Sequence, residues 1–67
     1  MINSKGQSKI LKMFMDNTGY TEEEMSERSH IPLKIMKNLI SGKSIITTSQ
    51  AVLLESELGL LHDNWED

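Results

Sequence analysis

Helix start and stop signals divide this chain at short intervals. Two capping boxes, Thr-Glu-Glu-Glu at 21–24 and Thr-Thr-Ser-Gln at 47–50, each offer side chains that satisfy the free N–H groups at a helix start. Pro32 marks a third start. Glycines follow apolar stretches at three places where a helix would end, namely Gly19, Gly42 and Gly59. Since no run of useful length alternates as a strand would, the sequence predicts an all-α fold.

The signals place four helices, at about 7–17, from the cap at Thr21 to about 28 or 29, at 32–40, and at 48–58. Each has apolar residues at helical spacing. These expected core residues are Ile10, Leu11, Phe14 and Met15, then Met25, then Ile35, Met36, Leu39 and Ile40, then Ala51, Leu54 and Leu58. We also expect a fifth turn or short helix from Leu60 to Trp65, with Trp65 returning to the core of a four- to five-helix bundle.

The length of 67 residues suits a single domain, 1–67, with an N-terminal arm at about 1–6. The chain contains no cysteine, which excludes disulfides and thiolate sites. No apolar run is long enough to span a bilayer, so we expect a cytoplasmic protein without a membrane partner. His30 and His62 lack other ligands at metal spacing, and no serine has a His–Asp context. We therefore expect no metal, no cofactor and no enzymatic activity.

Charge is distributed unevenly along the chain, although the net charge is −3. Residues 32–47 contain Lys34, Lys37 and Lys43 and no acid, whereas residues 21–31 and 48–67 are acidic. An acidic protein can still bind nucleic acid when its cations share one face. Such runs of like charge are equally typical of helix faces that are simply exposed to solvent. Charge alone therefore does not decide between a nucleic-acid-binding face and an ordinary solvent-exposed surface.

The segment from Thr21 to Gly42 has the order of a helix-turn-helix: a short capped helix, a break of about three residues and a second helix closed by glycine. Met25 and Ser26 pair one large and one small residue where two helices would meet, Ile31 lies in the turn, and Met36 would face them. A plain helical hairpin shows similar stripes, so the pattern by itself does not separate the two.

The ordered set of residues at 21–28, 31–32 and 35–43 resembles the Xre-type, λ-repressor-like helix-turn-helix family. Downstream, the stretch 46–59 followed by Trp65 is similar to antitoxins of the HigA type, and the resemblance covers about 11–65. It implies a λ-repressor-like bundle that regulates transcription by sequence-specific binding to double-stranded DNA, commonly as a homodimer on a palindrome. It also implies autoregulation of an operon shared with a toxin protein.

The resemblance places helix 32–40 in the major groove. Its outward face is expected to contain Leu33, Lys34, Lys37, Asn38 and Ser41. Lysines donate to guanine or phosphate, asparagine reads adenine or holds a phosphate, and a leucine meets a thymine methyl group. Thr21, Ser41 and Lys43 suit phosphate contacts at helix ends, and Lys5, Lys9 and Lys12 add contacts to the DNA backbone.

One position favours a different function. Many relatives have glutamine directly after the first cap of the motif, where it touches phosphate, and this chain has Glu22. A carboxylate there repels a phosphate by about 1 kcal/mol. The alternative is a protein-interaction module of the same fold with weak or no DNA affinity, which binds a toxin or regulator through Leu33, Leu53 or Leu61.

Overall fold

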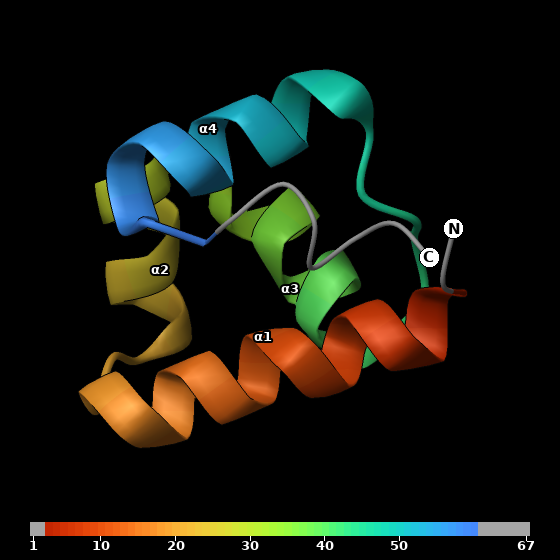
Figure 1. Ribbon diagram of the computed structural model, residues 1–67, viewed down its shortest axis with the longest axis horizontal. Helices are drawn as coiled ribbons and strands as arrows, with labels where there is room; N and C mark the ends of the chain where they lie inside the picture. Colours follow the sequence, from red (N-terminus) through yellow and green to blue (C-terminus); the bar gives the residue numbers. More distant parts are fainter. Residues whose placement is uncertain (1–2, 61–67) are drawn as a thin grey trace.

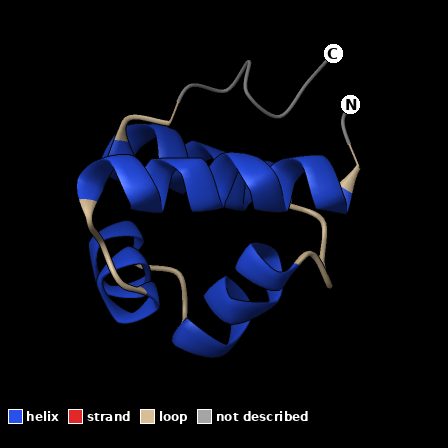
Figure 2. Cartoon of the chain, turned by 90° about the horizontal axis from the view of Figure 1, so that it is seen from below, coloured by secondary structure: helices blue, strands red, loops and turns tan. Residues whose placement is uncertain are grey.

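The computed structural model describes residues 3–60, which form four helices and, within that range, no strand. They are α1 (Ser4–Thr18), α2 (Glu22–Ser29), α3 (Leu33–Ser41) and α4 (Thr48–Leu58). Helix α1 packs against α3, and α2 packs against both α3 and α4 (Figure 1). Seen from below, α2 and α3 lie on one side of α1 (Figure 2). The all-α expectation is confirmed, whereas the fifth turn expected after Leu60, with Leu61, His62 and Trp65, falls outside the described residues.

Both capping boxes form as the sequence predicts. In α2, the Thr21 hydroxyl accepts the N–H of Glu24 at 3.1 Å, and the Glu24 carboxylate accepts the N–H of Thr21 at 3.0 Å. In α4, Thr47 and Gln50 exchange the same two bonds at 3.2 and 3.0 Å. Glycines with left-handed backbones end three helices, as expected for Gly19, Gly42 and Gly59.

Two helix starts differ from the sequence-based boundaries. Helix α1 begins at Ser4, because the Asn3 side chain caps it by accepting the N–H of Gly6 at 2.9 Å. Residues 4–6 are therefore helical and do not belong to an N-terminal arm. Helix α3 begins at Leu33, since Pro32 is its N-cap with a non-helical backbone (φ −52°, ψ 141°), and runs to Ser41. The Pro32 carbonyl accepts the first helical bond, from the N–H of Met36 at 2.9 Å.

The core lies where the four helices meet. Its buried apolar residues are Leu11, Met25, Ile31, Met36, Leu39, Ile40, Ile46, Ala51, Leu54 and Leu60. The half-buried residues Ile10, Phe14, Met15, Tyr20, Leu53 and Leu58 pack around them. The prediction for Ile35 is wrong, because this residue is 37% exposed. It is rotated by about 100° from Met36 around the helix, away from the face that α1 and α2 cover.

Polar residues hold the C-terminal end of α3 against α1. The buried Ser8 hydroxyl donates to the carbonyl of Ile40, and a Cβ added at Gly42 would lie 3.6 Å from the Cβ of Ser8. Gln7, only 1% exposed, accepts the N–H of Ile46 at 2.8 Å through its side-chain oxygen. The loop after α3 therefore has a fixed position on α1.

Candidate nucleic-acid interface

The turn between α2 and α3 is short and internally bonded. His30 has a left-handed backbone (φ 63°) at the end of α2. The Ser26 hydroxyl donates to the carbonyl of Ile31 at 2.6 Å, and the N–H of Ile31 donates to the Ser29 hydroxyl at 3.3 Å. Because Ile31 is buried beneath these bonds, the turn fixes the direction in which α3 leaves α2.

The polar residues expected on α3 do share one face. Lys34, Lys37 and Ser41 are exposed, and at about 100° per residue they fall within an arc of about 60°, opposite the buried Met36. Asn38 is half-buried at one edge of this arc, and Leu33 is half-buried at the other edge beside Lys37. In the view from below, α3 lies at the border of the described part of the molecule, and none of the other three helices lies beyond it (Figure 2).

Sequence reasoning missed Ile35 as a member of this face. Its direction around the helix is about 60° from that of Asn38, and it is exposed enough to touch a partner. The spacing of the apolar residues could have indicated this. If residues 36, 39 and 40 face the core, residue 35 lies at the flank of the helix, between the buried face and the exposed face. The exposed face of α3 thus has an apolar residue at each edge, Leu33 and Ile35.

The C-terminal end of α3 is ordered by the backbone of Asn38. The carbonyl of Asn38 accepts the N–H of Lys43 at 2.9 Å, the N–H of Ser44 at 3.3 Å and the hydroxyl of Ser41 at 3.2 Å. Among the described residues, no hydrogen bond engages the side-chain amide of Asn38. Lys43 is exposed directly after this end, so the structure places Ser41 and Lys43 together at one end of α3.

Thr21 is not part of that group. It caps α2 beyond the C-terminal end of α1, whereas Gly42 lies against Ser4 and Ser8 at the N-terminal end of α1. The fifteen residues of α1 separate the two places by about 22 Å. The oxygen of Thr21 is already an acceptor in the capping box, which leaves its O–H free to donate. Glu22, next to it, is half-buried at the start of α2.

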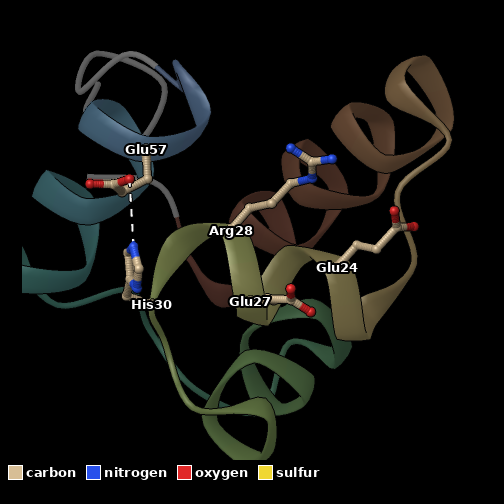
Figure 3. Close-up of a pocket in the computed structure, with 5 residues that line it drawn as sticks. All are labelled: Glu24, Glu27, Arg28, His30 and Glu57. Atoms are coloured by element: carbon tan, nitrogen blue, oxygen red, sulfur yellow. Dashed lines mark ion pairs between the residues drawn. The ribbon is translucent and has the colours of Figure 1, made fainter.

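Acidic side chains gather on the other two helices. A pocket of about 530 Å³ lies between α2 and α4 (Figure 3). Its lining consists of Glu24, Glu27 and Arg28 from α2, His30 at the end of α2, and Glu57 from α4. His30 Nε2 lies 3.7 Å from Glu57 Oε2. The Arg28 guanidinium lies 4.4 Å from the centre of the Tyr20 ring. This pocket makes the α2–α4 side of the molecule predominantly negative.

By contrast, the lysines at positions 34, 37 and 43 have no ion-pair partner among residues 3–60. The lysines of α1, at positions 5, 9 and 12, are exposed as well. The cations of the described chain are therefore concentrated on α1, α3 and the loop after α3, with Arg28 as the exception on α2.

The residues expected to serve a protein partner are less accessible than the sequence indicated. Leu53 is half-buried against the core, Leu33 is half-buried on α3, and Leu61 falls outside the described residues. The most exposed apolar side chains near them are Val52 on α4, 54% exposed, and Ile45 in the loop after α3. Within residues 3–60 no three His, Cys, Asp or Glu side chains are arranged to hold a metal ion.

None of the helices described here has the length and apolarity needed to cross a membrane. Comparisons of the chain with protein-family models, with curated proteins and with solved structures find no match. The candidate interface therefore stands on its own geometry and charge.

Proposed function

We propose that the protein is a DNA-binding transcription regulator of the helix-turn-helix type, whose α3 enters the major groove of double-stranded DNA. The observation that carries the proposal is the outward face of α3, which is exposed among the described residues. It joins two lysines that have no ion-pair partner within residues 3–60, an amide and a hydroxyl over about two helical turns. Lys34 and Lys37 are exposed on this face, and residues 32–47 contain no acid. A helix that reads a major groove needs such a face, with donors for guanine and for phosphate.

The proposed contacts divide into two kinds. Lys34, Lys37 and Asn38 read base edges, and Leu33 and Ile35 meet thymine methyl groups at the two edges of the face. Ser41 and Lys43 at the C-terminal end of α3, and Thr21 at the start of α2, contact phosphates and so position the protein on the DNA. A homodimer would place two copies of α3 about 34 Å apart, on successive major grooves of a palindrome.

The test is titration of the protein into duplexes that tile the region upstream of its gene and into a random-sequence duplex, at two salt concentrations. We expect retardation of both, tighter for one upstream duplex, with affinity falling as salt rises. Lys34→Gln with Lys37→Gln removes two positive charges from α3 and should abolish the preference for the upstream duplex.

The matched control is Ser49→Glu with Ser56→Glu, which lowers the net charge by the same amount at exposed positions of α4. We expect this control to retain the preference for the upstream duplex. Equal behaviour of the two variants would remove the α3 face from the interface, and no shift of any duplex at micromolar protein would overturn DNA binding altogether.

The second candidate is a protein-interaction module, favoured by the exposed Val52 and Ile45 and by the carboxylate of Glu22 beside the cap of α2. Its partner would be a toxin or another regulator encoded nearby. Under this function the duplex titration is negative, and a protein encoded by the neighbouring gene co-purifies with the wild type and is lost from Val52→Asp.

A further inference from the structure

A groove runs between α1 and the C-terminal end of α3. It has a volume of about 370 Å³, and its lining includes the lysines of α1, the small residues Ser8, Ser41 and Gly42, and Met13 and Asp16. The green end of α3 meets the red and orange part of α1 in Figure 1 at this place. We infer that this groove holds one strand of the DNA backbone, next to the duplex face that α3 reads, and the inference rests on the function proposed above.

The cations of the groove form a strip along α1. Lys5, Lys9 and Lys12 are four and three residues apart, so their directions around the helix differ by about 60° at most. Along the helix axis they cover about 10 Å. A DNA strand rises about 3.4 Å per phosphate along the duplex axis and also winds around that axis, so its neighbouring phosphates lie farther apart and the strip spans a short piece of at most about three nucleotides. A single phosphate ion would occupy only part of it.

The floor of the groove is made of small residues at the contact between α1 and α3. Gly42 has no side chain where it faces Ser8, and the Ser8 hydroxyl is turned inward to the carbonyl of Ile40. That buried bond holds α1 and α3 in a fixed relation, so the lysines have a defined position relative to α3. Met13 offers an adaptable apolar side chain that suits the deoxyribose rings between phosphates.

The groove is continuous with the face of α3. Ser41 lines the groove and also lies on the outward arc with Lys34 and Lys37. A strand that leaves the α3 face at Ser41 therefore passes directly to Lys5 and Lys9. Asp16 lies on the same strip, one turn beyond Lys12, and repels a phosphate at that end. The groove thus accepts a short piece of backbone and no more.

The experiment compares Lys9→Gln with Lys12→Gln against the wild type, on an upstream duplex and on a random-sequence duplex across a range of salt. Contacts to phosphate carry no sequence information. We therefore expect both duplexes to be bound about tenfold more weakly, and the log–log salt dependence to lose about 1 for each lysine removed. Circular dichroism checks that the exposed substitutions leave the fold intact.

Ser49→Glu with Ser56→Glu is again the control of equal charge, and it should weaken binding much less. If Lys9→Gln with Lys12→Gln behaves like this control while the wild type binds DNA, the groove is overturned and the proposed function remains. If the variant weakens only the upstream duplex, the groove contacts bases and the backbone assignment is overturned. If the wild type binds no duplex, the proposed function fails and this inference fails with it.

Discussion

The side-chain oxygen of Gln7 in α1 accepts the backbone N–H of Ile46, 2.8 Å away and 39 residues later in the chain. Both residues are buried, so replacing Gln7 with alanine leaves the N–H of Ile46 without an acceptor and without water. We expect Gln7→Ala to lower the free energy of unfolding by about 1–3 kcal/mol. Urea denaturation measures this, with the exposed Ser49→Ala as the control, and equal stability of the two variants would contradict the role of the bond.

A comparison of Gly42 with Gly19 separates two costs of adding a side chain, the strain of a left-handed backbone and the contact with a neighbouring helix. Both have left-handed backbones, with φ of 83° and 78°, but only Gly42 faces another helix, where an added Cβ would be in ordinary contact at 3.6 Å. We expect Gly42→Ala and Gly19→Ala to cost a similar amount, about 1 kcal/mol each, because the strain is the same. Thermal or urea unfolding checks this, and a much larger loss for Gly42→Ala would show that the contact between α1 and α3 tolerates no added atom.

His30 is the non-glycine residue with a left-handed backbone in the described chain, and its side chain is 69% exposed beside Glu57. We expect His30→Gly to raise the free energy of unfolding by up to about 1 kcal/mol, since glycine adopts this backbone without strain. Glu57→Gln should change stability by less than about 0.5 kcal/mol, because an exposed ion pair contributes little. If both variants lose stability instead, the contact between His30 and Glu57 contributes substantially to the free energy of unfolding.

Glu22 stands beside Thr21, at the start of α2, where a phosphate contact is proposed. We expect Glu22→Gln to tighten binding to every duplex several-fold, because it removes a repulsion of about 1 kcal/mol. The gain should shrink at high salt. Glu23→Gln is the matched control, since it removes the same charge from the exposed neighbouring position. Fluorescence anisotropy with labelled duplex measures both, and equal gains would mean that only net charge matters.

Local signals in the sequence predicted the helices well because their causes are local. The capping boxes at Thr21 and Thr47 form within four residues, and the left-handed glycines end helices whatever packs against them. The cap at Asn3 was overlooked because the apolar stripe of α1 begins only at Ile10, so the hydrophobic pattern gave no sign of the first turns. Of the five residues expected on the outward face of α3, Lys34, Lys37 and Ser41 are exposed there, whereas Leu33 and Asn38 are half-buried at its two edges.

Long-range polar contacts were beyond sequence reasoning. Gln7 and Ser8 are the kinds of residue found on surfaces, and nothing near them in the chain indicates that they lie under the end of α3. The groove between α1 and α3 depends on that crossing, so its lining was not predictable from the spacing of Lys5, Lys9 and Lys12 alone.

The separation of charge between the α1–α3 side and the α2–α4 side has a consequence for encounters in solution. Residues 3–60 form an electric dipole, because their lysines and most of their glutamates lie on different sides, whereas the net charge of the whole chain, −3, is repelled by a polyanion at long range. Within about a Debye length, roughly 8–10 Å, the torque on that dipole turns the lysine side forward and the glutamate side away. Because of the net repulsion, fewer collisions with a polyanion lead to binding than would for a neutral protein. Those that do lead to binding begin with the lysine side facing the polyanion.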